Sequence, residues 1–107
     1  MNIKKYILFS DVLLSNNKLK SFYTTSYGFE LMLKLYDQSK SETNMHIDEL
    51  YSNLNSGLPR REAFGKYINR LVASGYIKKI THNQKKSMKS IVLSTNIIAE
   101  LDKVFER

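Results

Sequence analysis

Residues 58–93, LPRREAFGKYINRLVASGYIKKITHNQKKSMKSIVL, constrain the fold of this chain more than any other stretch. In the first half, apolar side chains recur at helical spacing, and Gly75 follows as a C-terminal stop. The second half predicts two short strands, residues 76–82 and 87–93, joined by a polar turn at residues 83–86. We therefore expect an amphipathic helix that packs against the base of a two-stranded hairpin.

The same stretch concentrates the positive charge of the chain. It holds nine of the 17 Lys and Arg residues but only one of the ten acids, Glu62. The other residues carry eight bases and nine acids, so the net charge of +7 comes from this helix and hairpin. A localised excess of this kind is typical of a surface that binds a polyanion.

Length and composition narrow the class of protein. At 107 residues, the chain predicts one domain, residues 1–107, whose modest core makes dimerisation a reasonable way to bury more surface. The absence of cysteine excludes disulfides and thiolate metal sites, and it fits a cytoplasmic protein. Ser10 and Asp11 interrupt the first apolar run, so we expect neither a signal peptide nor a membrane span.

Nothing in the sequence points to catalysis. The two histidines, His46 and His82, have no cysteine beside them, so no metal site is expected. The chain has no paired carboxylates at a catalytic spacing, no nucleophile motif and no glycine-rich phosphate loop. We therefore predict a protein that is not an enzyme and that needs no cofactor.

The N-terminal segment, residues 1–23, leaves two alternatives open. Residues 6–9 are apolar enough for a short strand, in which case Asp11 would cap a helix from Val12. Alternatively, residues 3–14 form one helix that ends at Asn16 and Asn17. In both cases the segment is too apolar to lie free in water, so it packs on the domain or on a second subunit.

Three helices are predicted before the hairpin. Residues 26–39 carry a broad apolar stripe, which indicates a central helix. Residues 48–54 form a short helix that His46 or Asp48 caps, and Gly57 lies in the turn that follows. Pro59 suits the first position of the third helix. The buried face of that helix is predicted to hold Phe64, Ile68, Leu71 and Val72. Its opposite face carries Glu62, Ala63, Lys66, Asn69, Arg70 and Ala73.

A final helix, residues 96–106, follows the hairpin after Ser94 or Thr95 as its cap. Its apolar stripe exceeds what one small domain readily covers. We expect that stripe, together with the N-terminal segment, to form a homodimer interface, although the helix could instead fold back on its own core. The predicted interface residues are Ile97, Ile98, Leu101, Val104 and Phe105.

This order of elements resembles a winged helix-turn-helix of the multiple-antibiotic-resistance-regulator (MarR) type. The similarity spans residues 26–95 and includes the Leu-x-x-x-Gly-x-Ile unit at Leu71, Gly75 and Ile77. The other matching residues are Leu50, Leu54, Ile68, Leu93, Ser94 and Thr95. The resemblance implies an α+β, mostly helical fold with a winged-helix core at residues 26–93, an N-terminal packing segment at 1–23 and a C-terminal helix at 95–107. In the wing, this chain has lysines where that family commonly has an acid–arginine pair.

The resemblance also implies how the chain would bind double-stranded DNA. The third helix would enter the major groove, with Lys66, Asn69 and Arg70 nearest the base edges. Arg60 and Arg61 would lie near phosphates, and Tyr67, at the border of the buried face, could touch one. The alternative for this face is a solvated helix surface.

The hairpin would contribute as the wing, tracking the DNA backbone or placing its tip in the minor groove. Its lysines could alternatively serve only to protect a sheet edge. The wing residues predicted to contact DNA are Lys78, Lys79, Asn83, Gln84, Lys85, Lys86 and Lys89.

The function that these features predict is sequence-specific binding of double-stranded DNA by a homodimer, most simply a transcriptional regulator. Two-fold symmetry predicts repeated half-sites about one helical turn apart. The alternative is a plasmid or phage DNA adaptor that binds a centromere or a conjugative transfer origin and also has a protein partner. A third interpretation is a winged helix used for protein contact, with lysines that only confer solubility.

Overall fold

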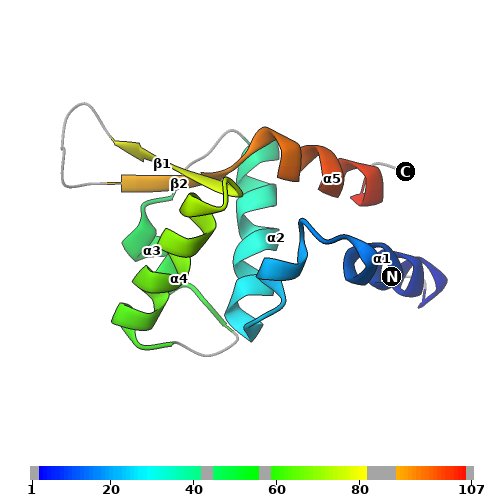
Figure 1. Cartoon of the computed structure of the whole chain (residues 1–107), viewed down its shortest axis with the longest axis horizontal. Coiled ribbons are helices and arrows are strands. Elements are labelled where there is room, and N and C mark those ends of the chain that lie inside the picture. Colours follow the sequence, from blue (N-terminus) through cyan, green and yellow to red (C-terminus); the bar gives the residue numbers. More distant parts are fainter. Residues whose placement is uncertain (1–2, 42–44, 56–58, 82–88, 106–107) are drawn as a thin grey trace.

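The computed structural model describes residues 3–41, 45–55, 59–81 and 89–105. Its helices and strands follow in the order α1 (Ile3–Ser15), η1 (Lys20–Phe22), α2 (Ser26–Ser41), α3 (Ile47–Ser52), α4 (Arg61–Ala73), β1 (Ile77–Thr81), β2 (Lys89–Leu93) and α5 (Thr95–Phe105). Figure 1 shows α2 at the centre, the hairpin projecting at one end and α1 at the other. The molecule measures 45 × 27 × 25 Å along its principal axes.

The core forms where α2 meets α4, the base of the hairpin and α5. Leu31, Met32 and Leu35 of α2 are fully buried, as the apolar stripe of residues 26–39 predicts. The other fully buried side chains with large volumes are Phe22, Leu19, Leu50, Ile68, Leu71, Ile77, Ile91, Ile97 and Leu101. Helix α2 packs mainly on β2, η1 and α5, whereas α4 packs on β1 and α3 on β2.

Strands β1 and β2 pair antiparallel, with Ile77 opposite Leu93 and Lys79 opposite Ile91. Ile91 and Leu93 are buried, as predicted, but their burial does not alternate with exposed polar neighbours, because Ser90 is also fully buried and Val92 is partly buried. A single bridge between His46 and Ser90 adds the residue before α3 to the outer edge of β2. Three helices and a hairpin in this arrangement form the predicted winged helix-turn-helix.

The structure settles two open questions at the ends of helices. Residues 3–15 form one helix, so the alternative with a strand at residues 6–9 is wrong. Pro59 was predicted at the first position of α4, but the helix begins at Arg61 after Arg60 as its N-cap. Pro59 therefore lies in the connection, where its carbonyl accepts a 2.6 Å hydrogen bond from the Tyr51 hydroxyl.

Helix α5 folds back over α1 and α2. The Tyr36 hydroxyl of α2 donates a 2.6 Å hydrogen bond to Asp102, and the Lys40 ammonium lies 2.8 Å from the same carboxylate. The Asn16 amide donates to Glu100 at 2.8 Å. No helix among the described residues has the length and apolar character needed to cross a membrane.

Candidate nucleic-acid interface

Helix α4 is positioned by its buried apolar face and by the glycine at which it ends. Phe64, Ile68 and Leu71 are buried, as predicted, whereas Val72 is only partly buried. Gly75 has φ 78°, a left-handed conformation that favours glycine. The N–H of Gly75 donates to Val72 O and that of Tyr76 to Leu71 O, both at 3.0 Å. This Schellman motif turns the chain directly into β1 and fixes the hairpin relative to α4.

The opposite face of α4 is open to solvent. Glu62, Ala63, Lys66, Asn69 and Ala73 are all exposed, in agreement with the predicted helical wheel. The Lys66 ammonium lies 3.8 Å from the Glu62 carboxylate, with three-quarters or more of both side chains exposed. An exposed ion pair of this type contributes little to stability. The exposed face of α4 is therefore available to a binding partner, because contacts within the chain do not occupy it.

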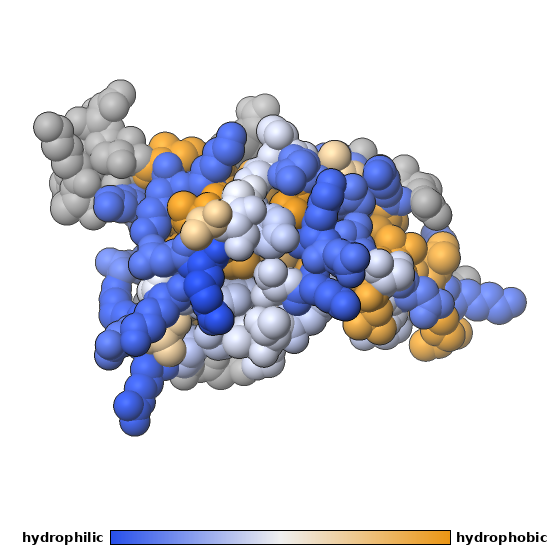
Figure 2. All heavy atoms as spheres, viewed as in Figure 1, coloured by the Kyte–Doolittle hydropathy of each residue, from blue (hydrophilic) through white to orange (hydrophobic). Residues whose placement is uncertain are grey.

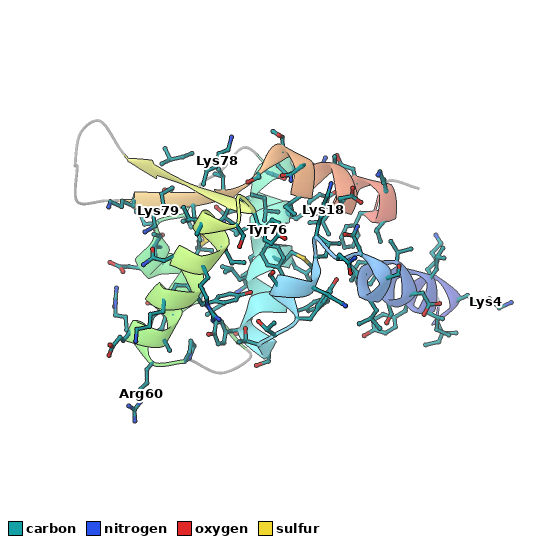
Figure 3. The ribbon with its side chains drawn as sticks, viewed as in Figure 1. Lys4, Lys18, Arg60, Tyr76, Lys78 and Lys79 are labelled. Carbon is teal, nitrogen blue, oxygen red and sulfur yellow. The ribbon has the colours of Figure 1, made fainter. Side chains whose placement is uncertain are left out.

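The two arginines at the start of α4 differ in their surroundings. Arg60 projects outward from the end of the helix (Figure 3). Arg61 instead pairs with the Asp48 carboxylate of α3, and its guanidinium lies 5.3 Å from the ring centroid of Tyr51. Arg61 thus links α3 to α4, and it could reach a phosphate only in competition with Asp48.

Arg70 lies on the flank of α4 that faces η1. Its guanidinium is 5.7 Å from the ring centroid of Tyr67. It borders two adjoining hollows, one beside Tyr27 of α2 and one between η1 and the end of α4. The polar side chains that line the second hollow are Ser21, Thr24, Tyr67, Arg70 and Ser74. An arginine surrounded by hydroxyls offers hydrogen-bond donors of the kind that contact phosphate.

Ser21 of η1, Thr24 of the connection and Tyr27 of α2 were not among the predicted site residues. Ser21, Thr24 and Tyr27 precede α4 by more than 30 residues and carry no charge, so the charge pattern contains no signal for them. They come to α4 because the Tyr67 hydroxyl donates a 2.8 Å hydrogen bond to Ser21 O. Gly28 permits this approach, since a Cβ there would lie 2.4 Å from the Tyr67 hydroxyl oxygen.

Tyr67 itself belongs to the core. Its side chain is only 2% exposed, and burial raises the pKa of its hydroxyl to about 12. Because the hydroxyl already donates to Ser21 O, the expectation that Tyr67 touches a phosphate is corrected: it positions η1 and supports Arg70.

The described stem of the hairpin splits its lysines between two faces. The Lys79 ammonium donates a 2.7 Å hydrogen bond to Asn69 Oδ1 on α4, so the wing and the exposed helix face are continuous. Successive side chains in a strand alternate, which places Lys78 on the opposite side of the hairpin. Figure 3 shows Lys78 directed away from α4 and Lys79 beside it. The register puts Lys89 on the same side as Lys79.

The predicted contacts at the tip of the wing, Asn83, Gln84, Lys85 and Lys86, lie outside the described residues, as does His82. Of the surface that is described, many hydrophilic side chains lie at the end formed by α4 and the hairpin stem in Figure 2, with hydrophobic side chains among them at the stem, where Ile80 is 39% exposed. Seven of the predicted cations belong to this part: Arg60, Arg61, Lys66, Arg70, Lys78, Lys79 and Lys89. Across the described ranges, no group of three His, Asp or Glu side chains is placed to hold a metal ion.

The predicted dimer residues of α5 have different environments. Ile97 and Leu101 are 0% exposed, because α5 folds back on the core of its own chain. Those two side chains are therefore core residues and present no surface to a partner in this conformation. Ile98 and Val104 are partly buried, and Phe105 is 43% exposed, with its ring 4.8 Å from that of Phe9 and 5.1 Å from that of Tyr36.

Larger exposed apolar side chains lie on α1, where Figure 2 shows a group of them. Ile3, Ile7 and Leu14 are each more than half exposed and share one face of the helix, opposite the side that contacts α5. Tyr6 and Leu8 are also exposed. The interface was predicted mainly on α5, whereas the structure exposes a larger apolar surface on α1.

No protein-family model matches the sequence, and no curated protein matches it. Solved structures do match, and three illustrate the likeness. A mutant MepR from a multidrug-resistant S. aureus clinical isolate superimposes with a TM-score of 0.64 at 16% identity, covering 94% of this chain and 70% of MepR. Overoxidized AbfR bound to DNA gives 0.59 at 24% identity, covering 94% and 68%.

The third is a mutant MarR from E. coli complexed with operator DNA, with a TM-score of 0.60 at 19% identity over 98% of this chain and 66% of that protein. At these identities, the likeness shows the fold. The chain has the MarR-type winged helix fold that the Leu-x-x-x-Gly-x-Ile unit and the order of elements predicted, and its N-terminal helix is included in the match.

Proposed function

We propose that this MarR-type winged helix protein binds double-stranded DNA at a specific site and regulates transcription by occupying it. The observation that carries the proposal is the continuous basic surface formed by the exposed face of α4 and the hairpin stem, joined by the hydrogen bond between Lys79 and Asn69. Of the three solved structures described above, two are bound to DNA, and one of these complexes contains operator DNA.

The arrangement supports a division of labour along α4. Lys66 and Asn69 lie on the middle of the exposed face, where they can reach base edges in the major groove. Arg60 at the start of the helix would contact a phosphate, and Arg70, which was predicted near the base edges, would contact a phosphate on the flank beside η1 instead. On the other flank, Lys79 and Lys89 extend the contact along the hairpin toward the next phosphates.

We also propose that two copies act together through α1. Ile3, Ile7 and Leu14 form an apolar stripe that the chain does not cover itself. On the side of α1 that faces α5, Phe105 lines a separate apolar groove with Tyr6, Leu8 and Phe9. An exposed patch of this composition is typical of a protein–protein interface, and a two-fold dimer would present two copies of α4 to successive major grooves.

The decisive experiment is a fluorescence-anisotropy titration of the purified protein with duplexes from its own upstream region and with a scrambled duplex, repeated across a salt series. Phosphate contacts give a negative slope of log affinity against log salt of about 0.9 per contact. We expect roughly four to six contacts per subunit and a clear preference for one upstream duplex. Equal, weak binding to both duplexes would overturn site-specific recognition, and no binding at low salt would overturn DNA binding itself.

A further inference from the structure

A small hollow lies between η1 and the C-terminal end of α4, on the flank of the candidate interface. This η1–α4 hollow is lined by Ser21, Thr24, Tyr67, Arg70, Leu71 and Ser74. Its volume is ≈ 160 Å³, well below the roughly 300–1,000 Å³ of sites for small organic ligands. The hollow therefore has room for one small group and not for a drug-sized compound.

Main-chain contacts hold the walls of the hollow together and do not use two of its hydroxyl groups. Ser21 O accepts a 2.8 Å hydrogen bond from the Tyr67 hydroxyl and a 3.1 Å hydrogen bond from the Thr24 hydroxyl. The Ser74 N–H donates to Arg70 O at 3.0 Å. The side-chain hydroxyls of Ser21 and Ser74 take no part in these contacts, so each can donate to a ligand in the hollow.

Arg70 gives the hollow a permanent positive charge. Its guanidinium lies over the Tyr67 ring, 5.7 Å from the ring centroid. The ring covers a face of the guanidinium, whereas the N–H donors lie in its plane and stay open to an acceptor. Arg70 also lines the adjoining hollow beside Tyr27, to which Lys66 adds a second cation. Among the described residues, no acid lines either hollow, so both favour an anion.

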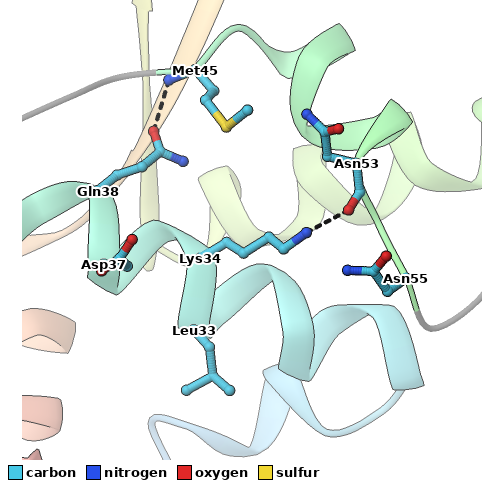
Figure 4. A pocket seen from close by; sticks show the side chains of 7 residues that line it. All are labelled: Leu33, Lys34, Asp37, Gln38, Met45, Asn53 and Asn55. Atoms are coloured by element: carbon cyan, nitrogen blue, oxygen red, sulfur yellow. Dashed lines mark hydrogen bonds between the residues drawn. The ribbon is translucent and has the colours of Figure 1, made fainter.

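The larger hollow between α2 and α3 has the opposite charge balance. The Lys34 ammonium there donates to Asn53 O, as Figure 4 shows. The same ammonium lies 3.0 Å from the Glu30 carboxylate, and the exposed Asp37 also lines this hollow. Two carboxylates beside one ammonium are unfavourable for an anion. An anion should therefore prefer the hollow that Arg70 lines.

We infer that the η1–α4 hollow seats a phosphate of the DNA backbone, so that contact with DNA extends to η1, outside the helix-turn-helix and the wing. The phosphate oxygens accept from the Arg70 guanidinium and from the hydroxyls of Ser21 and Ser74. Arginine and serine side chains commonly bind phosphate oxygens in this way. That the phosphate belongs to DNA rests on the proposed function, in which the adjoining α4 enters the major groove.

The first test needs no DNA. The ¹⁵N-labelled full chain is titrated with sodium phosphate at constant ionic strength, and NMR follows the side-chain N–H of Arg70 and the main-chain N–H of Ser74. We expect saturable shifts with a dissociation constant on the order of 10 mM, as for one weakly held anion. Shifts that rise linearly, or that sodium chloride alone reproduces, would overturn the inference.

Ser21→Ala combined with Ser74→Ala is the decisive variant, because it removes both hydroxyls and no charge. The exchange at Ser21 keeps the main-chain oxygen that accepts from Tyr67, and circular dichroism checks that the fold is retained. We expect this double variant to bind phosphate roughly fivefold more weakly or worse. Ser52→Ala changes an exposed serine of α3 outside the hollow and should bind phosphate like the parent. Equal binding by the double variant would overturn the hollow as a site.

A second test places the phosphate on DNA. Duplexes that each carry one neutral methylphosphonate, at successive backbone positions of the preferred duplex, are titrated with the parent and with the double variant. At one position the methylphosphonate should cost the parent about threefold in affinity and the double variant almost nothing, because that contact is already lost. Additive losses at every position would overturn a DNA phosphate as the occupant. If no duplex is preferred, the proposed function fails, whereas the titration with inorganic phosphate still decides whether the hollow binds an anion.

Discussion

At the scale of single residues, Gly28 shows how a small side chain places part of the candidate interface. A Cβ at this position would lie 2.4 Å from the Tyr67 hydroxyl, 2.8 Å from Thr25 Oγ1 and 2.9 Å from Phe22 O. Gly28 therefore allows α2, η1 and α4 to meet, which brings Ser21 and Thr24 beside Arg70. Without this close approach, η1 would have to move away from α4.

We expect Gly28→Ala to lower the free energy of unfolding by about 1–3 kcal/mol, because the added methyl overpacks a closed site. Gly65→Ala is the matched control: nothing lies within 4 Å of its Cβ position, and alanine in the middle of a helix is favoured by roughly 0.5–1 kcal/mol. Chemical denaturation followed by circular dichroism measures both. Destabilisation of equal size in the two variants would contradict the steric explanation.

Asp48 is a residue whose removal should strengthen DNA binding. Its carboxylate pairs with Arg61, and both side chains are more than half exposed. In Asp48→Asn, Arg61 is released to a phosphate, so affinity should rise by roughly fivefold, the equivalent of about 1 kcal/mol for one exposed ion contact. The slope against salt should steepen by about 0.9.

The titration for Asp48→Asn is compared with that for Asp37→Asn, which removes an exposed acid of α2. This control should change affinity much less, since Asp37 lies beside Met45 and Asn55 on another side of the molecule. If both variants gain equally, the effect is one of net charge, and Arg61 has no particular role in it.

At the scale of elements, the two basic elements are predicted to contribute unequally. The Lys66 ammonium pairs with the Glu62 carboxylate, and the Arg70 guanidinium lies over the Tyr67 ring. On the hairpin, Lys79 contacts only the neutral Asn69 in the part of the chain that the structure describes. The pair Lys79→Ala and Lys89→Ala should therefore cost about tenfold in affinity, against about threefold for Lys66→Ala and Arg70→Ala.

Anisotropy titrations at one fixed salt concentration measure both double variants, which remove the same number of charges. A loss for the helix pair that equals or exceeds the loss for the hairpin pair would refute the predominance of the wing. Circular dichroism spectra check that both variants keep the fold.

Helix α5 gives a prediction about acid stability. Hydrogen bonds from Lys40 and Tyr36 hold the pKa of Asp102 below its usual range, and those from Asn16 and Lys103 do the same for Glu100. A depressed carboxyl pKa stabilises the folded state above the unfolded-state pKa of about 4, and the effect is lost as pH falls through the folded value. The contacts of α5 with α1 and α2 should therefore weaken below about pH 4.

Asp102→Asn should lower the melting temperature by a few degrees at pH 7. This difference in melting temperature between the parent and the variant should shrink as the pH falls to 3. Asp37→Asn is the control, since Asp37 is exposed near the same end of α2. Thermal melts at several pH values measure the effect. A difference between parent and Asp102→Asn that stays constant from pH 7 to pH 3 would be incompatible with the ionised carboxylate as its source.

The elements that the sequence predicted well are those that carry a local signal. The spacing of Phe64, Ile68 and Leu71 and the stop at Gly75 define α4 within a few residues. The apolar residues Ile91 and Leu93 mark β2, although the strand is buried at Ser90 as well and does not alternate as expected. The position of Pro59 was misjudged because the Tyr51 hydroxyl holds its carbonyl in the connection, a contact that no local pattern contains. Ser21 and Thr24 were missed for the same reason: only tertiary packing brings them to Arg70.

At the scale of the whole molecule, α1 lies at the opposite end from α4 and the hairpin (Figure 1). The exposed apolar side chains of α1 are therefore far from the basic side chains of α4 and the hairpin stem. A dimer formed through α1 would therefore leave both copies of α4 and both hairpins uncovered. This explains why burial of Ile97 and Leu101 inside the chain is compatible with a dimer: α5 supports α1 from within, and α1 supplies the outer stripe. Binding of two half-sites about one helical turn apart requires such a pair.

Ile7→Glu tests this assembly, because Ile7 lies in the middle of the stripe and is 53% exposed in the single chain. A charge at this position would be desolvated in a dimer but would stay in water in a monomer. We therefore expect the variant to elute as a monomer in size-exclusion chromatography with light scattering. Its melting temperature should stay close to that of the parent diluted until it is monomeric. Ile80→Glu makes the same change at an exposed residue of the hairpin and should leave the dimer intact.

On a duplex with two half-sites, the Ile7→Glu protein should lose affinity by at least tenfold, whereas on a single half-site it should bind like the parent, since its own α4 and wing are unchanged. A parent chain that is already monomeric at micromolar concentration, or an Ile7→Glu variant that remains dimeric, would remove α1 as the interface and would leave DNA binding to a single winged helix.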